Sequence, residues 1–250
     1  MTRLGILLQT LASAIFVMAG LRFSTRPVTS SQPVHEFGPL LPLPLQPDPN
    51  RVMAIPHLYL DPSNWLMWSL LLTIWTLVLL DAAGQWIDPT DKEPARNGRS
   101  LIWPTFSLAM VGAALGPWLF AHRPGWLVIG SALTAAIAIL AARQGAGRQR
   151  PAIGFFAGWA TAVFSAALAG LAAATLSLPV QALSALAILP GAAIGMAAQV
   201  WIGPSIGYST ALIWAFCGIA VTTMGSDPMI ALAAIIGIAG MAAVLVRAAS

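Results

Sequence analysis

Eight long apolar stretches, separated by short segments rich in proline, glycine and charge, make up most of the sequence. A helix needs about 20 predominantly apolar residues to cross the hydrocarbon core of a bilayer. The predicted spans are Leu4–Leu21, Asn64–Leu80, Leu101–Ala121, Trp126–Ala142, Ile153–Ser177, Gln181–Ile202, Gly207–Thr223 and Pro228–Val246. We therefore expect an all-α, polytopic transmembrane helix bundle of about eight spans. Because the region from Ser177 to Thr223 carries no charge that reports its sidedness, seven spans remain possible.

The composition strengthens this prediction. Of the 250 residues 58% are apolar and 8% are charged, whereas a soluble domain is roughly 25% charged. Charge is costly at the centre of a bilayer, and every acid and base falls outside the predicted spans or at their ends, as Asp81 does. We therefore expect no titratable group in the interior of the bundle.

The basic residues predict the orientation, since they are enriched on the cytoplasmic side. With the N-terminus inside, the inside segments carry Arg3, Lys92, Arg96, Arg99, Arg143, Arg148, Arg150 and Arg247, and the outside segments carry Arg22, Arg26, Arg51 and Arg123. This distribution favours a multi-pass protein of the bacterial inner membrane with both termini cytoplasmic. The net charge of +4 forms no basic stripe, so nucleic acid is not an expected partner.

Three parts of the chain differ in composition. Residues 1–21 resemble a secretory signal, but the apolar run is long enough to be retained as a signal-anchor helix. Residues 22–63 contain nine prolines, which forbid a helix and favour extended backbone, so we expect a long periplasmic loop. This loop either packs on its own helix ends or contacts a partner or the membrane surface. Residues 64–250 form the helical bundle.

The sequence carries no pattern of catalytic or metal-binding residues. Cys217 is the single cysteine, which excludes an intrachain disulfide and a multi-thiolate metal site. No nucleophile motif, phosphate-binding loop or metal-ligand spacing is present. We therefore expect a protein that is not an enzyme, with no catalytic residue and no metal.

Tryptophans and small residues are the remaining signals. Several of the ten tryptophans lie near span ends, where an aromatic belt explains them. The deeper indoles and nearby polar groups either fill space between helices or line a pocket for a planar apolar ligand; these candidate ligand-binding residues are Trp68, Trp75, Thr76, Trp159, Trp214 and Gln199. Pairs of glycines one helical turn apart, Gly112 with Gly116, Gly154 with Gly158 and Gly191 with Gly195, permit close helix contact.

The tryptophan-bearing stretches resemble the TspO/MBR, or tryptophan-rich sensory, family. Asn64-Trp65-Leu66-Met67-Trp68, followed by Ile74-Trp75-Thr76-Leu77, is similar to the second segment of these proteins. An N-terminal helix and a Pro-rich loop ahead of that segment look like the longer alphaproteobacterial branch. The resemblance implies an inner-membrane protein that binds tetrapyrroles (of the porphyrin or bacteriochlorophyll type), lipids or other flat apolar ligands.

Two other functions remain open. The first is an accessory structural subunit of a larger photosynthetic or respiratory complex, which would pack against membrane lipids and other transmembrane proteins. The glycine-lined helices and the Pro-rich segment motivate it. The second is a passive permease for an uncharged substrate, whose path would need polar residues; the polar residues within the spans are scattered, namely Gln9, Thr76, Thr161, Gln199 and Thr222.

Overall fold

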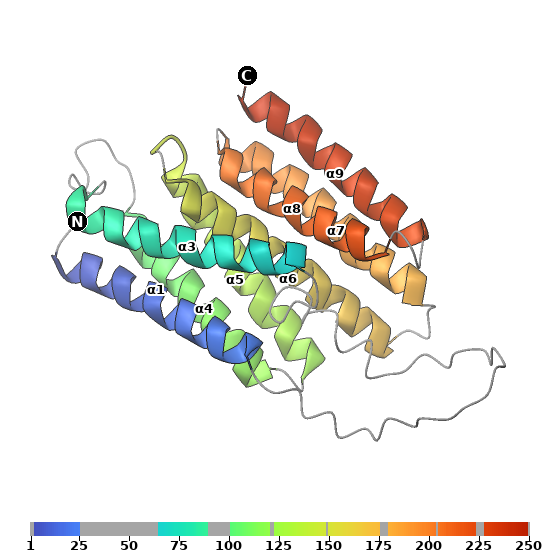
Figure 1. The fold of residues 1–250 in the computed structure, drawn as a ribbon, viewed down its shortest axis with the longest axis horizontal. Coiled ribbons are helices and arrows are strands. Elements are labelled where there is room, and N and C mark those ends of the chain that lie inside the picture. The colour runs from blue at the N-terminus through green and yellow to red at the C-terminus, as the bar shows by residue number, and fades with distance from the viewer. Residues whose placement is uncertain are drawn as a thin grey trace.

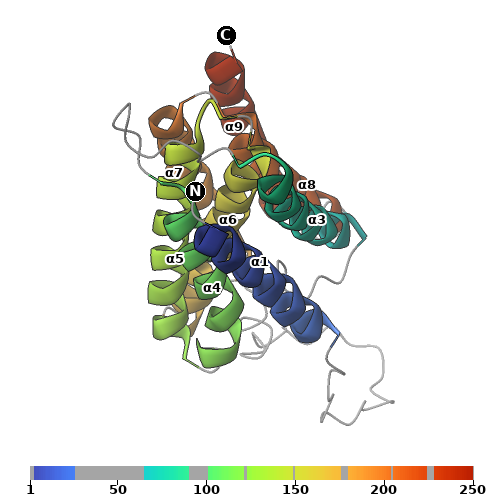
Figure 2. The same cartoon turned by 90° about the vertical axis from the view of Figure 1, so that its left-hand side faces the viewer.

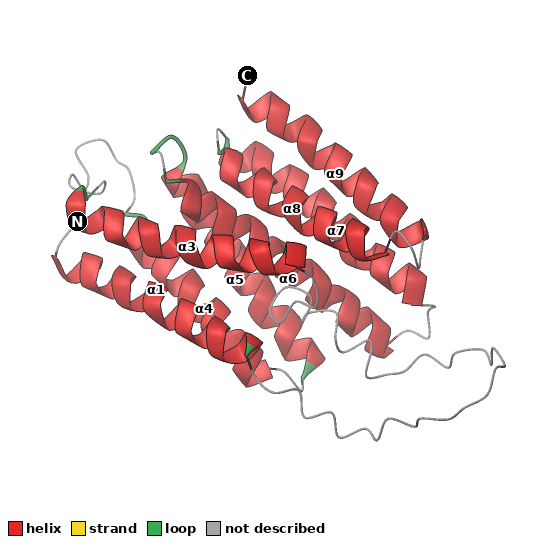
Figure 3. Cartoon of the chain, viewed as in Figure 1, coloured by secondary structure: helices red, strands yellow, loops and turns green. Residues whose placement is uncertain are grey.

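The described part of the chain is helical throughout. The computed structural model describes residues 3–25, 65–89, 101–120, 123–148, 150–175, 180–203, 205–223 and 228–249, and these ranges contain helices and turns but no strand (Figure 3). The helices are α1 (Arg3–Ser24), α3 (Trp65–Ile87), α4 (Trp103–Phe120), α5 (Pro124–Gly145), α6 (Pro151–Thr175), α7 (Val180–Ile202), α8 (Ile206–Thr223) and α9 (Pro228–Ala249). The predicted all-α fold is confirmed, and the Pro-rich segment from residue 26 onward lies outside the described residues.

Proline and glycine set several helix boundaries. Helices α5, α6 and α9 begin at prolines, whose missing N–H would have no partner in a first turn anyway. Helices α5 and α7 are followed by Gly147 (φ 74°) and Gly203 (φ 86°), which adopt the left-handed backbone that ends helices. Each predicted stretch matches a helix within a few residues, except that α3 continues past its predicted end at Leu80 to Ile87.

The length and hydropathy of the helices are those of a helical membrane bundle. Four segments are long and apolar enough to cross a membrane, and three shorter apolar stretches belong to α7, α8 and α9; the four are Arg3–Ser24, Trp65–Ile87, Pro124–Gly145 and Pro151–Ala172. Large apolar side chains such as Leu72, Leu133 and Ile235 are more than half exposed on its outer surface. Such a surface suits lipid rather than water.

Helix α6 forms the centre of the bundle (Figures 1 and 2). Its apolar segment is 83% buried, against 22–39% for the other three long segments. It packs against α5, α7, α8 and, less extensively, α3. Its tightest neighbour is α8, because a Cβ at Gly154 would lie 2.5 Å from Ser205 Oγ and a Cβ at Gly158 would overlap the carbonyl oxygen of Tyr208. A side chain at Gly207 on α8 would meet the Pro151 carbonyl oxygen in return, at 2.6 Å.

Consecutive helices run in opposite directions. Contacts between helix ends show this: Gly5 lies against Trp103, Arg150 pairs with Asp81, and Arg143 stacks on Trp201. The starts of α1, α4, α6 and α8 and the ends of α3, α5 and α7 therefore share one end of the bundle. Both chain termini lie at this end as well (Figure 1).

Candidate functional site

Two of the predicted tryptophans meet on one cavity between α1, α3, α4 and α6. This cavity, of about 20 Å³, is called the aromatic cavity here. It is lined by Phe16, Ala19, Gly20, Phe23, Leu71, Trp75, Ala113, Ala114, Pro117, Trp118 and Trp159. Trp75 and Trp159 are 5% and 2% exposed, so both indoles are interior groups. A flat apolar wall of this kind is typical of sites for planar ligands.

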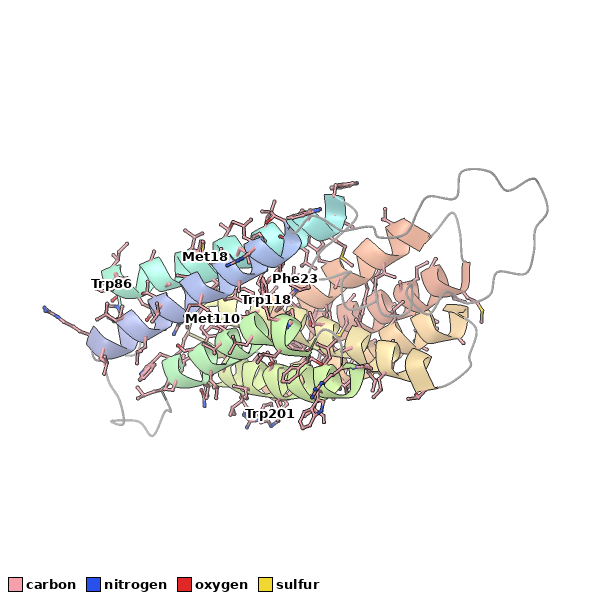
Figure 4. The ribbon with its side chains drawn as sticks, turned by 90° about the horizontal axis from the view of Figure 1, so that it is seen from below. Met18, Phe23, Trp86, Met110, Trp118 and Trp201 are labelled. Carbon is pink, nitrogen blue, oxygen red and sulfur yellow. The ribbon has the colours of Figure 1, made fainter. Side chains whose placement is uncertain are left out.

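Ring-to-ring contacts fix the walls of the aromatic cavity. The Trp159 indole lies 5.6 Å from the Phe16 ring and 5.7 Å from the Phe156 ring, measured between centroids. The Phe23 and Trp118 rings meet edge to face at 5.9 Å (Figure 4). Edge-to-face pairs add about 0.5–1.5 kcal/mol each beyond the area they bury, so these rings hold one another in place.

Trp75 is the one polar side chain on this cavity with a buried group left without a partner. Its indole N–H forms no hydrogen bond. An ideal Cβ at Gly20 would lie 3.0 Å from Trp75 Nε1 and 2.9 Å from Cζ2, so the glycine lets α1 approach the face of α3 that carries this indole. Because a buried donor without an acceptor is costly, this N–H is the chemically active group of the site.

A second cavity, of about 30 Å³, lies on the other side of Trp159 and Pro117. It is lined by Gly112, Ala113, Gly116, Pro117, Leu127, Gly130, Ser131, Thr134, Trp159, Ala160 and Val163. Pro117, inside α4, has no N–H to donate to the Ala113 carbonyl one turn earlier. Ala113 and Pro117 line both cavities. The two cavities therefore meet α4 where its backbone hydrogen bonding is interrupted.

The other predicted site residues lie elsewhere. Trp68 is half-buried against the core, and half-buried Trp214 meets the Phe155 ring at 6.1 Å. Thr76 is exposed and donates a hydrogen bond to the Leu72 carbonyl of its own helix. Neither Trp68, Thr76 nor Trp214 lines the two cavities described above. Sequence reasoning instead missed Phe16, Phe23 and Trp118, the last because its place near a span end matched an aromatic belt.

Gln199 has a structural environment. Its amide nitrogen donates to the Gly203 carbonyl at 2.9 Å, and its amide oxygen accepts from Ser209 Oγ at 2.8 Å. It is fully buried and joins the end of α7 to the start of α8. This geometry is that of an interhelical hydrogen bond, and Gln199 lines neither of the two cavities described above.

A buried ion pair corrects the expectation that the interior lacks titratable groups. Asp81 lies inside α3 because that helix continues to Ile87, and its side chain is 5% exposed. Arg150, directly before α6, is 3% exposed and donates from Nε and Nη2 to the two Asp81 oxygens at 2.9 and 2.6 Å. Gln9 of α1 donates to the same carboxylate at 2.8 Å. We call Gln9, Asp81 and Arg150 the Asp81 cluster.

The Asp81 cluster joins three helices at the end of the bundle opposite the aromatic cavity. The charges of Asp81 and Arg150 neutralise each other, which lowers the cost of holding them among apolar helices. Next to the cluster, the Trp86 indole donates to Thr10 Oγ1 at 3.0 Å, a second link between α3 and α1. Figure 4 shows Trp86 far from Phe23 and Trp118 along the bundle. These polar contacts hold α1, α3 and the start of α6 together, and the Asp81 and Arg150 side chains are covered.

Of the polar residues considered for a permease path, the four whose side chains are described, Gln9, Thr76, Thr161 and Gln199, are bonded to protein groups. Gln9 contacts Asp81, and the Thr161 hydroxyl lies 3.0 Å from the Tyr208 hydroxyl in the α6–α8 contact. A wider opening of about 260 Å³ lies between the turns at Gly145–Gly147 and Ser205–Gly207. Arg150 is part of its lining, and none of the predicted site residues is. Among the described residues, no three His, Cys, Asp or Glu side chains lie close enough together to hold a metal ion.

The fold defines a class, that of helical membrane proteins. No protein-family model, no curated protein and no solved structure matches the chain. The resemblance to tryptophan-rich sensory proteins therefore stays a prediction.

Proposed function

We propose that the chain is a non-enzymatic, multi-pass protein of the bacterial inner membrane that binds a flat apolar ligand, a tetrapyrrole or a smaller ring, at the aromatic cavity. One observation carries the proposal: Trp75 and Trp159, far apart in sequence, line the same cavity, and the Trp75 N–H is unpaired there. Aromatic walls offer a planar apolar ligand surfaces for stacking, and one polar group among them orients it.

The charge distribution supports the membrane orientation in this proposal. Arg3, Arg143, Arg148, Arg150 and Arg247 all lie at the end that holds both termini, and Arg22 and Arg123 lie at the other. An excess of basic residues favours the cytoplasmic side. The aromatic cavity then lies in the periplasmic half of the membrane, near the end of α1.

Porphyrin binding tests the proposal. Purified protein titrated with protoporphyrin IX should show saturable quenching of tryptophan fluorescence. Trp75→Ala and Trp159→Ala should each weaken the apparent affinity about tenfold, since each removes a stacking surface worth about 1 kcal/mol or more. Trp214→Ala makes the same change away from the cavity and should bind as the wild type does. The absence of saturable binding of porphyrin and of smaller flat rings would refute the proposal.

The accessory-subunit hypothesis has less support. Two of the three glycine pairs that motivated it contact other helices of the same chain: Gly154 and Gly158 face α8, and Gly191 and Gly195 face Ser165, Leu212 and Met241. In the third pair Gly112 meets Thr134, and Gly116 has no atom near an added Cβ. Its remaining ground is the Pro-rich segment, which lies outside the described residues. Extraction in mild detergent would test it, because a subunit of a larger assembly should migrate with other proteins.

A further inference from the structure

We infer that the aromatic cavity selects flat rings that carry a carbonyl oxygen, which accepts a hydrogen bond from the Trp75 indole N–H. The inference rests on the proposed function and specifies its ligand class. It starts from the chemistry of one buried group: Trp75 is 5% exposed, and its N–H has no acceptor.

The surroundings of this N–H explain why the acceptor has to come from a ligand. Every other side chain that lines the aromatic cavity is apolar or is another indole, and an indole is a donor only. On α1, an added Cβ at Gly20 would lie 3.0 Å from Trp75 Nε1, and glycine has no side chain to offer there. Lipid tails have no acceptor either, so a ring with a carbonyl oxygen gains a hydrogen bond that a plain hydrocarbon ring cannot form.

The size of the cavity indicates how such a ring enters. A space of about 20 Å³ is smaller than any aromatic ring system, so a wall has to move. Helix α1 supplies Phe16, Ala19, Gly20 and Phe23 to that wall. Its first half is held to α3 by the Gln9–Asp81 and Trp86–Thr10 hydrogen bonds. Near the cavity α1 is joined to its neighbours by ring contacts, those of Phe16 with Trp159 and of Phe23 with Trp118. Separation of the second half of α1 breaks these contacts and opens a slot beside Trp75.

The test compares 9-fluorenone with fluorene, two flat rings of nearly equal shape of which only the first has a carbonyl oxygen. Binding to the full chain in nanodiscs is measured by equilibrium dialysis and corrected for partition into empty nanodiscs. Wild-type protein should prefer fluorenone about fivefold, the effect of one net hydrogen bond. Trp75→Phe keeps an aromatic ring and removes the N–H, so the preference should fall to about one. Trp214→Phe makes the same chemical change off the cavity and should keep the preference.

A second readout observes the hydrogen bond itself. In protein labelled with ¹⁵N at the indole nitrogens, the N–H signal absent from Trp75→Phe should move downfield with fluorenone and stay in place with fluorene. Equal binding of the two rings to the wild type, or an unmoved Trp75 signal, would overturn the inference and leave the proposed function standing. Failure of both rings and of porphyrin to bind would refute both.

The same signal separates a ring from a lipid as the source of the carbonyl. In nanodiscs of ether-linked lipids no ester carbonyl is present, and fluorenone should still shift the Trp75 signal. If the signal differs between ester and ether lipids without any ring, and fluorenone adds nothing, the group on Trp75 is a lipid ester and the ring assignment is wrong.

Discussion

At the scale of single residues, the Asp81–Arg150 pair is the feature with the largest energetic consequence. Both side chains are almost completely covered, and the arginine donates two hydrogen bonds to the carboxylate. Breaking a buried pair by removing one partner costs about 3–5 kcal/mol, because the remaining charge stays buried. Replacing both partners by apolar residues costs much less.

Asp81→Asn should therefore destabilise the protein by about 3–5 kcal/mol, since Arg150 keeps its charge without a counterion. The double variant Asp81→Leu with Arg150→Met should be more stable than Asp81→Asn. Thermal unfolding of the purified protein in detergent measures both effects. Asp88→Asn, a matched change at an exposed acid just beyond α3, should shift stability by no more than about 1 kcal/mol, because interactions of exposed charges contribute little. Equal effects of Asp81→Asn and Asp88→Asn would contradict this account.

The sequence contains part of the information for this pair. Asp81 follows an apolar run, but Ala82, Ala83 and Gly84 continue it, and this is a visible sign that the helix passes the acid. The partner is 69 residues away, and no local pattern links the two positions. In the same way, the apolar run from Asn64 to Leu80 correctly placed Trp68 and Trp75 on one helix, whereas the packing of α3 against α1 at Gly20 makes Trp75 the one that lines a cavity.

At the scale of elements, the crossing of α6 and α8 depends on glycine. The backbones come so close that a side chain at Gly158 would overlap the Tyr208 carbonyl oxygen and lie 2.9 Å from the Ala211 Cβ. Backbone atoms of a neighbouring helix cannot rotate away as a long side chain can. The two helices would have to separate, and the Thr161–Tyr208 contact would open with them.

Gly158→Ala should therefore destabilise the bundle by about 2–3 kcal/mol through overpacking. Gly116→Ala is the matched control, because Gly116 belongs to an equivalent glycine pair on α4 but has no atom within 4 Å of an added Cβ. It should leave stability unchanged or raise it slightly, as alanine favours helix. Chemical unfolding of both variants in detergent provides the comparison, and a Gly116→Ala variant as unstable as Gly158→Ala would exclude the explanation.

Helix positions followed from the sequence more readily than helix contacts did. Continuous apolar runs placed each helix within a few residues, apart from the end of α3, because length and hydropathy are local properties. Glycine spacing indicated which helices can approach closely, yet Gly154 and Gly116 belong to identical motifs and have opposite environments. That difference arises from which helix lies opposite, and this is a property of the assembled bundle.

At the scale of the whole molecule, the alternating helix directions place both termini and most of the described arginines at one end. The central position of α6 also belongs to this scale. A helix with apolar residues on all sides suits a buried position, and small residues let its neighbours approach closely. Helix α6 has both kinds: the small residues are Gly154, Ala157, Gly158 and Ala160, and the large apolar ones include Phe155 and Phe156.

Cysteine labelling in spheroplasts tests the orientation. In a Cys217→Ser background, Arg123→Cys should react with a membrane-impermeant maleimide added outside, because it lies at the end opposite the termini. Arg3→Cys and Arg247→Cys should react only after the membrane is made permeable. Labelling of both Arg3→Cys and Arg247→Cys in intact spheroplasts would show that the topology is the reverse of the proposed one. Labelling of only one of the two would show that the chain crosses the membrane an odd number of times.

The Asp81–Arg150 pair also has a consequence for biogenesis. The acid is synthesised with α3, whereas its counterion follows only after α4 and α5 have left the ribosome. A carboxylate at the centre of an inserting helix costs roughly 2.5–3.5 kcal/mol, and a part of this cost applies to Asp81 near the end of α3. Until Arg150 is synthesised, Gln9 of α1 is the donor already present for this carboxylate, and its charge has no counterion. We therefore expect chains truncated before Arg150 to be less stable and to be substrates for quality-control proteases.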